Sequence, residues 1–171
     1  MTVLDILAGL AKTGRWGPVA IGADVNELVA AFGEPWDAGS MSRSRQWPRL
    51  FTYGDLELSV CRCRRVNLIC VQAWRDAIAL PSSAAGRTRS HPAALTYGDV
   101  ARALDRADCA WEPQASLTFG TQSALMALPS RASFVFETFE DEDEDDTGDA
   151  GGEEPILHTM GLPGDHHTCP A

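Results

Sequence analysis

The fold class is decided by the stretch Leu50-Phe51-Thr52-Tyr53-Gly54-Asp55-Leu56-Glu57-Leu58-Ser59-Val60. Its second half alternates apolar and polar residues, which is typical of a half-buried strand. Gly54-Asp55 is a turn signal that separates this strand from the apolar run before it. A further apolar run over 66–74 follows a short basic connection. We therefore predict a three-stranded antiparallel meander over 50–53, 56–61 and 66–74.

Outward from the meander, capping signals and periodicity predict helices over 3–11, 25–32 and 97–108. Thr2 with Asp5, and Thr96 with Asp99, form capping-box patterns at the starts of the first and third helices. The second helix begins after Asp24 and ends at a glycine that precedes Pro35. The residues predicted to form the core are Leu28, Phe32, Leu58, Leu68, Val100, Leu104 and Phe134.

The connections between these elements are predicted from their polar, glycine and proline content. Residues 37–49 are expected to form a polar loop that carries Arg43, Arg45 and Arg49, and residues 81–92 a linker. After the third helix we expect strands over 117–119, 124–128, 133–139 and 156–160.

The two halves of the chain repeat the same order of elements. Asp24 and Thr96, the two helix caps, lie 72 positions apart, and strands follow both helices. The alternative is that any two well-capped amphipathic helices would align as well. We predict an α+β fold of two tandem helix plus antiparallel β-meander repeats forming one two-layer domain. Its limits are 1–162, with repeat one at 16–80, repeat two at 93–162, and a flexible tail over 163–171.

The net charge of −10 comes from one segment of the 171 residues. Between Glu137 and Glu154 there are 11 acidic residues and no basic ones, so the remainder is nearly neutral. Nine of the 13 arginines lie between Arg43 and Arg89. The acidic balance argues against general binding of nucleic acids. No apolar run approaches the ~20 residues of a membrane-spanning helix.

The acidic segment has three interpretations: a solvated loop, an electrostatic loop that binds a partner, or a cation site. It lacks the ligand spacing of an EF-hand loop, and we expect 140–154 to be a mobile loop that folding does not require. The arginines of the basic connection between the second and third predicted strands, Arg62, Arg64 and Arg65, have three interpretations: a solvated rim, a site that binds the acidic loop, or an anion site. The candidate partner-binding residues are Glu140, Asp141, Glu142, Asp143, Glu144, Asp145, Asp146, Arg62, Arg64 and Arg65.

Cysteine and histidine supply the residue types of a metal site without the usual spacing. The set comprises Cys61, Cys63, Cys70, His91 and the tail His166-His167-Thr168-Cys169. Paired zinc ligands are usually separated by two residues, whereas Cys61 and Cys63 are separated by one. Cys70 and Cys109 are expected to fill the core. We predict no metal and no cofactor, and five cysteines favour reduced thiols in a cytoplasmic protein.

Two motifs carry a resemblance to known proteins. Residues 21–35, with the form apolar-Gly, capped helix, Gly-x-Pro, and the strand Tyr53-Gly54-Asp55-Leu56-Glu57-Leu58 resemble small bacterial α+β proteins with a "YGDLE" strand. Some proteins of that group are suspected immunity proteins of toxin systems. The helix-then-meander unit resembles the fold shared by β-lactamase inhibitor protein and an outer-membrane-assembly lipoprotein, which is a binding fold. The resemblance covers 16–75 by motif and 93–160 by pattern, and it implies no catalytic residues.

The function expected from these observations is a non-enzymatic cytoplasmic module that binds a protein partner. An immunity protein that neutralises a toxin is the specific form of this hypothesis. The alternatives are an uncharacterised housekeeping domain without a dedicated partner, a small metal-binding protein, and a small hydrolase. No nucleic-acid or membrane partner is expected.

Overall fold

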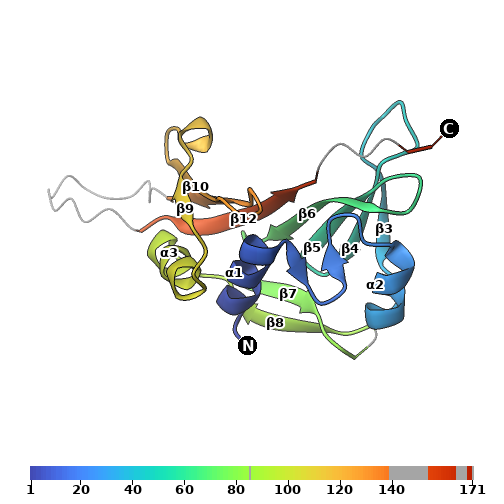
Figure 1. The fold of residues 1–171 in the computed structure, drawn as a ribbon, viewed down its shortest axis with the longest axis horizontal. Helices are drawn as coiled ribbons and strands as arrows, with labels where there is room; N and C mark the ends of the chain where they lie inside the picture. Colours follow the sequence, from blue (N-terminus) through green and yellow to red (C-terminus); the bar gives the residue numbers. More distant parts are fainter. Residues whose placement is uncertain (85, 139–153, 165–168, 171) are drawn as a thin grey trace, which may run out of the picture.

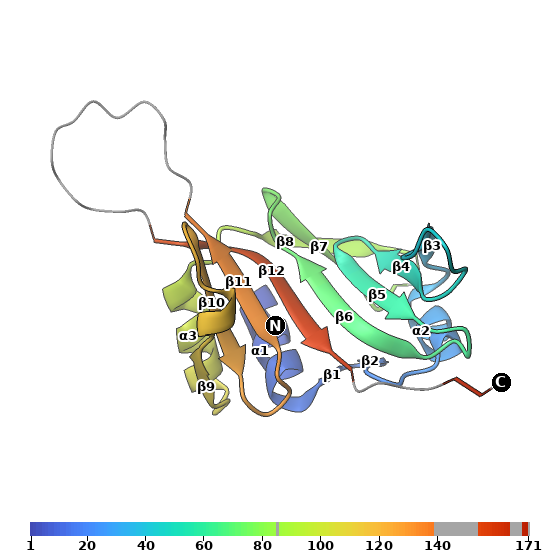
Figure 2. The ribbon, with the colours of Figure 1, turned by 90° about the horizontal axis from the view of Figure 1, so that it is seen from above.

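The predicted meander forms part of a large antiparallel sheet in the computed structural model, which describes residues 1–84, 86–138, 154–164 and 169–170. The strands of this sheet are β3 (Trp36–Ser40), β4 (Arg49–Tyr53), β5 (Leu56–Val60), β6 (Val66–Gln72), β9 (Trp111–Pro113), β10 (Gln122–Ala127), β11 (Ser133–Glu137) and β12 (Ile156–Pro163). Their order across the sheet is β3-β4-β5-β6-β12-β11-β10-β9, as Figure 2 shows. Two small hairpins accompany the sheet: β1 (Arg15–Trp16) with β2 (Val19–Ala20), and β7 (Ala77–Pro81) with β8 (Thr88–Pro92). The fold is mixed α+β.

The helices within the described residues are α1 (Val3–Thr13), α2 (Val25–Phe32) and α3 (Tyr97–Arg106). The predicted capping boxes are present, and the Thr2 hydroxyl accepts a hydrogen bond from the Asp5 amide at 3.2 Å. All three helices and the β7–β8 hairpin lie on the same side of the sheet (Figure 1). None of the described helices has the length and apolar character needed to cross a membrane.

The core lies between the sheet and these helices. One residue from each of five neighbouring strands is buried in register, and these residues are Leu56, Val71, Met160, Phe134 and Leu125. Six of the seven predicted core residues are buried, and Leu68 is the exception.

Leu68 is half-buried because a β-bulge changes the phase of β6. The pairing shifts between Ser59 and Val60, so that Val66 pairs with Val60 while Leu68 pairs with Ser59. One extra residue on β6 reverses the side to which the following side chains point. Ile69 and Val71 therefore enter the core, and Leu68 and Cys70 do not. The prediction that Cys70 fills the core is wrong, whereas Cys109 is buried as expected.

Two segments at the edges of the sheet were predicted incorrectly. An edge strand is held by backbone hydrogen bonds to its neighbour, so its own side chains need not show a strand pattern. The expected loop over 37–49 begins as strand β3, whose residues are mostly exposed and show no apolar alternation. No strand forms over 117–119: Leu117 ends a 3₁₀ turn, η1 (Ala115–Leu117), and Phe119 makes only an isolated bridge with Gln122. The edge strand β9 lies earlier in the chain. Neither edge strand buries the apolar stripe on which a prediction from sequence depends.

The third incorrect connection is the linker expected over 81–92, whose last five residues form strand β8. It pairs with β7 from Ala77↔Pro92 to Pro81↔Thr88. Ile78 and Leu80 of β7 are buried, whereas β8 is polar and exposed except for His91. Its composition predicts a linker because its partner strand, not its own side chains, supplies the packing.

Burial of His91 predicts a pH-dependent contribution to stability. The side chain is 9% exposed. Burial lowers the pKa of His91 below its usual value of 6.5, and the neighbouring Arg89 guanidinium lowers it further. As the pH falls below 6.5, the unfolded chain binds a proton that the folded chain does not, so stability is lost down to the folded pKa. Replacing His91 with asparagine should flatten the dependence of the urea midpoint on pH between about 7 and 5. Parallel profiles for the two proteins would contradict this assignment.

Candidate functional site

The side of the sheet opposite the helices is an uncovered surface. No α-helix of the described residues packs on it (Figures 1 and 2). The strand register places one residue of every strand in a continuous row across it, and the row is Trp36, Thr52, Glu57, Cys70, Gly161, Ser133, Met126 and Glu112. We call the surface defined by this row the open face. The six inner residues are half-buried, because each lies between two neighbouring strands.

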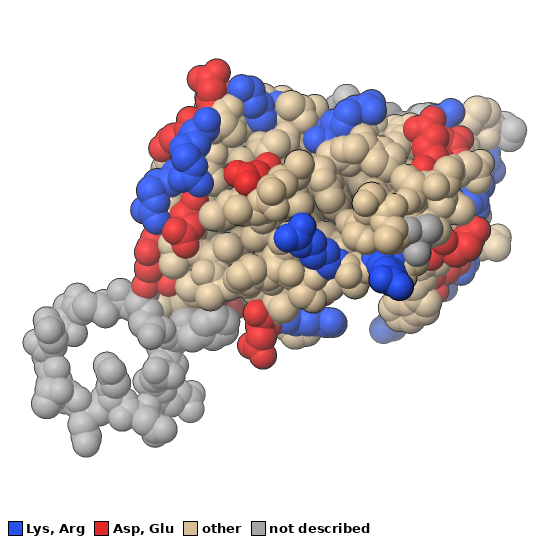
Figure 3. Space-filling model, turned by 90° about the horizontal axis from the view of Figure 1, so that it is seen from below, with Lys and Arg blue, Asp and Glu red and all other residues tan. Residues whose placement is uncertain are grey.

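The middle of the row, from Cys70 through Gly161 to Ser133, is small and uncharged. Thr52, Cys70, Gly161 and Ser133 occupy four of the six inner positions of the row. The Glu57 carboxylate within the row accepts a hydrogen bond of 2.9 Å from the side-chain amide of Gln72 on β6. The opposite side of the molecule, which the helices cover, carries scattered arginines, lysine and carboxylates (Figure 3). A solvated surface normally carries long charged side chains, so this sheet face is unusual in chemistry.

An exposed aromatic side chain stands at one end of the row. Trp36 on the edge strand β3 is 71% exposed and shares a face with Thr52. Next to it on the edge, Asp37 pairs with the Arg49 guanidinium at 2.9 Å, and this pairing lowers the pKa of Asp37. Tryptophan is enriched among residues that dominate binding energy at protein interfaces.

The predicted arginines Arg62, Arg64 and Arg65 lie together in the turn between β5 and β6. The Arg65 guanidinium donates to the carbonyl of Gly22 at 3.2 Å and lies 3.9 Å from the Asp24 carboxylate. The Arg64 carbonyl accepts a hydrogen bond from the first amide of α2 at 3.0 Å. The turn is therefore fastened to the start of α2, and part of its positive charge is used within the chain.

The predicted acidic residues Glu140–Asp146 lie outside the described residues. Glu154, at the end of the predicted acidic loop, is described, and its carboxylate accepts a hydrogen bond from the Gly98 amide at 2.6 Å. Gly98 is in the first turn of α3, where amide groups lack partners in the helix. The prediction that 140–154 is a mobile loop that folding does not require falls on residues outside the described ones, except at Glu154, which this hydrogen bond joins to α3.

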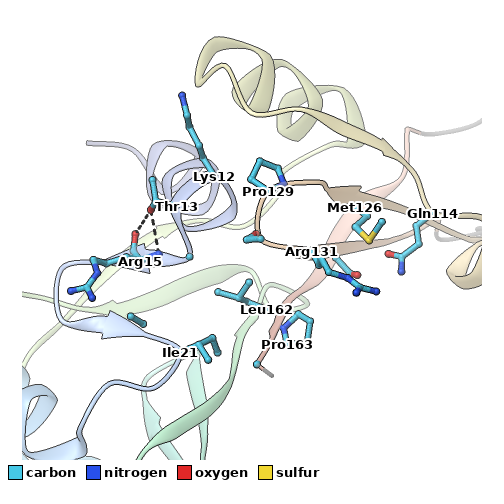
Figure 4. A pocket seen from close by; sticks show the side chains of 15 residues that line it. Lys12, Thr13, Arg15, Ile21, Gln114, Met126, Pro129, Arg131, Leu162 and Pro163 are labelled. Atoms are coloured by element: carbon cyan, nitrogen blue, oxygen red, sulfur yellow. Dashed lines mark hydrogen bonds between the residues drawn. The ribbon is translucent and has the colours of Figure 1, made fainter. Parts of the chain in front are cut away.

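A cleft of about 700 Å³ lies between the end of α1, the β1–β2 hairpin and the β10–β11 turn (Figure 4). It presents Arg15 and Arg131, both exposed, and no described lining residue is a carboxylate. Lys12 at its rim donates to the Ala107 carbonyl at 2.7 Å. The Thr13 hydroxyl donates to the carbonyls of Gly9 and Arg15, so it is not activated by a base. The chemistry of this cleft suits an anionic group and offers no acid–base pair.

A second cleft of about 340 Å³ lies beside the end of β6. His158 lines it, with Nδ1 3.3 Å from a carboxylate oxygen of Glu137. That separation is an ion-pair distance without hydrogen-bond alignment, since Nδ1 is buried and has no hydrogen-bond partner. Trp74 at the same cleft is stacked with Arg75, whose guanidinium carbon lies 4.7 Å from the ring centroid. Asp76 also lines this cleft, and its described lining includes no serine, threonine, cysteine or lysine.

Three cysteines from distant parts of the sequence converge beside the β5–β6 turn. The sulfur of Cys63 lies 3.1 Å from that of Cys61 and 3.3 Å from that of Cys169. All three sulfurs lie within 4.8 Å of one another. Cys70 and His91, the other described members of the predicted metal-ligand set, are not part of this cluster.

Hydrogen bonding within the cluster separates the acidities of two thiols. The pKa of Cys169 lies below its usual value because the backbone and thiol of Cys63 donate hydrogen bonds to its sulfur. The pKa of Cys63 is raised to about 12 because its hydrogen bond with Cys61 and burial both favour the protonated thiol. Cys169 is therefore the first of these two thiols to ionise.

A comparison with known protein families, curated proteins and solved structures finds no match to this chain. The candidate sites consequently rest on the geometry alone. The open face was not predicted from the sequence. Alternation of residues along a strand shows that the strand has two faces, but whether helices cover a face is known only from the structure. Sequence reasoning noticed the cysteine cluster as residue types but could not predict that Cys169 meets Cys63.

Proposed function

We propose that the protein is a non-enzymatic module that binds a partner protein through the open face. The observation that carries the proposal is the continuous row across eight strands, which is small and uncharged from Cys70 to Ser133 and ends at Trp36. Eight strands spaced ~4.8 Å apart give a width of ~34 Å, and five to eight residues give a length of ~17–25 Å. The resulting area of ~600–800 Å² is close to the ~800 Å² that each partner buries in a standard protein interface.

The partner that we propose is a toxin, which would make the protein an immunity protein. This specific form is supported by the resemblance of residues 16–75 to small bacterial proteins with the same helix and "YGDLE" strand. A cytoplasmic location is part of the proposal and is supported by the odd number of cysteines. The contrasting function is a housekeeping domain without a dedicated partner, in which case the open face contacts only water.

We also propose that the fold is a tandem repeat. In each half, a capped helix precedes four strands that follow one another in the sheet: α2 precedes β3 to β6, and α3 precedes β9 to β12. The two meanders meet at their last strands, β6 and β12. This symmetrical order supports a duplicated unit whose two sheets combine into one wide binding surface.

Site-directed photo-crosslinking in the native cell tests the binding proposal. A photoreactive residue at Thr52 or Ser133, both on the open face, should give one adduct of discrete mass. The same residue at the exposed Asn26 of α2 is the matched control and should give none. Equal adducts from both sides of the molecule, or none from the open face, would contradict the proposal.

A charge placed on the open face should weaken binding of the crosslinked partner. We expect Ser133→Arg to weaken affinity by about 2 kcal/mol or more, roughly 30-fold, because an unpaired charge would be buried at the interface. Asn26→Arg adds the same charge on α2 and should leave the affinity unchanged. Isothermal titration with the purified partner measures both. Equal affinities for the two variants would place the interface elsewhere.

A further inference from the structure

The turn that carries Cys61 and Cys63 is held rigid by its own backbone. The Cys61 amide donates to the Arg65 carbonyl at 3.0 Å, and the Arg64 amide donates to the Cys61 carbonyl at 2.9 Å. Arg64 has a φ of 60°, which completes the tight reversal. Because this turn is also bonded to the start of α2, the two sulfur atoms are positioned before any ligand binds.

The segment after β12 is directed to the same place by two contacts. The Gly164 amide donates to the Asn67 carbonyl at 3.0 Å. A Cβ atom at Gly164 would lie 2.5 Å from that carbonyl oxygen, so only glycine allows this approach. Beyond it, the Arg62 guanidinium donates to the Pro170 carbonyl. Cys169 is therefore held beside the β5–β6 turn although 106 positions separate it from Cys63 (Figure 2).

The separations between the sulfurs suit a shared metal ion. In tetrahedral zinc sites the zinc–sulfur distance is about 2.3 Å, which places neighbouring sulfurs ~3.8 Å apart. Here two of the sulfur–sulfur distances are 3.1 and 3.3 Å and all three are within 4.8 Å, so changes of about 1 Å or less in each distance reach that geometry. A disulfide needs about 2.05 Å between two sulfurs and would leave the third cysteine of the cluster without a role.

We propose that Cys61, Cys63 and Cys169 form a zinc site that ties the C-terminal segment to the β5–β6 turn. A zinc ion with three protein ligands completes its tetrahedron with a further ligand such as water. Three thiolates and Zn²⁺ carry a net charge of −1, and Arg62, Arg64 and Arg65 lie in the same turn as two of the cysteines, where their positive charge opposes it. These arginines stabilise the bound state in addition to any role on the protein surface. The site is independent of the open face, so each proposal can fail without the other.

Zinc binding to the reduced full-length protein tests the site. After incubation with Zn²⁺ in the presence of a non-thiol reductant and gel filtration, elemental analysis should find one zinc per chain. Cobalt should bind at the same stoichiometry and give the near-ultraviolet sulfur-to-cobalt absorption that only thiolate ligands produce. The melting temperature should rise with zinc concentration, because the metal binds the folded state in preference.

Mutating a residue that only hydrogen-bonds to a metal ligand weakens metal binding by roughly 10–100-fold. Cys63→Ser and Cys169→Ser each remove a ligand itself, so they should weaken zinc binding by more than this. Cys70→Ser is the matched control, since Cys70 is half-buried on the open face and outside the cluster, and it should bind zinc normally. Circular dichroism confirms that each variant is folded. Absence of zinc from the reduced protein, equal loss in Cys70→Ser, or binding of Cu⁺ without Zn²⁺ would overturn the proposal. A disulfide within the cluster that persists in reductant would also overturn it.

Discussion

Replacing Phe134 with alanine is expected to lower the free energy of unfolding by about 3–5 kcal/mol. Phe134 lies in β11, between Met160 of β12 and Leu125 of β10, and all three residues are buried. Its side chain is fully buried in the core, one strand away from β12, where the two halves of the sheet meet. Truncation loses the transfer free energy of the ring and leaves a cavity that the surrounding strands cannot close. Equilibrium urea denaturation measures the loss.

Phe119→Ala provides the matched control for that experiment. Phe119 lies in the turn before β10 and is 64% exposed, so its truncation should change stability by less than about 0.5 kcal/mol. The comparison separates loss of packing from loss of a phenyl ring as such. A loss below about 1 kcal/mol for Phe134→Ala would show that β11 does not contribute to the core in this register.

Features specified within a few residues could be predicted from the sequence. The capping boxes at Thr2 and Thr96 join atoms three residues apart, and both are present in the structure. The three strands of the first meander begin and end within two residues of the predicted limits, because their apolar alternation is local. The helices α2 and α3, which begin the two halves, could be predicted for the same reason.

Features specified by a distant partner could not be predicted in this way. β3 and β8 exist because β4 and β7 offer unpaired backbone groups, and nothing in their own composition indicates a strand. The bulge that moves Leu68 out of the core depends on the pairing of β5 with β6. Periodicity is read along one chain segment, so it does not detect a change of phase that a neighbouring strand imposes.

The candidate sites follow the same division. The residue types of the cysteine cluster are visible in the sequence, but the spacing rule for metal ligands counts pairs within one turn. Here the third cysteine comes from the far end of the chain and is placed by contacts at Gly164 and Pro170. The open face likewise becomes visible only when Trp36, Ser133 and Gly161 are assigned to one row by the sheet order.

The "YGDLE" strand has a structural explanation that leads to the second large effect. Gly54 has a φ of 65°, and the adjacent Asp55 amide donates to the Ala79 carbonyl at 2.7 Å. The Asp55 carboxylate accepts a hydrogen bond from the Ala79 amide, also at 2.7 Å. The Tyr53 hydroxyl donates to the Gly33 carbonyl at 3.0 Å. These residues fasten the β4–β5 turn to β7 and to the end of α2, so the motif is required for packing.

Gly54→Ala is accordingly expected to destabilise the protein by roughly 3 kcal/mol, as the sum of two costs. A left-handed backbone conformation costs a residue with a Cβ atom about 1–2 kcal/mol. A Cβ atom at Gly54 would also lie 2.5 Å from the Ala79 carbonyl oxygen, so the turn must separate from β7 and weaken the hydrogen bonds between them. Gly120→Ala isolates the first cost, because Gly120 has a φ of 55° and no atom within 4 Å of the added carbon. Urea denaturation of both variants should therefore show a larger loss at Gly54. Equal losses would mean that the turn moves away from β7 without cost, and that the "YGDLE" residues have a role other than docking this turn.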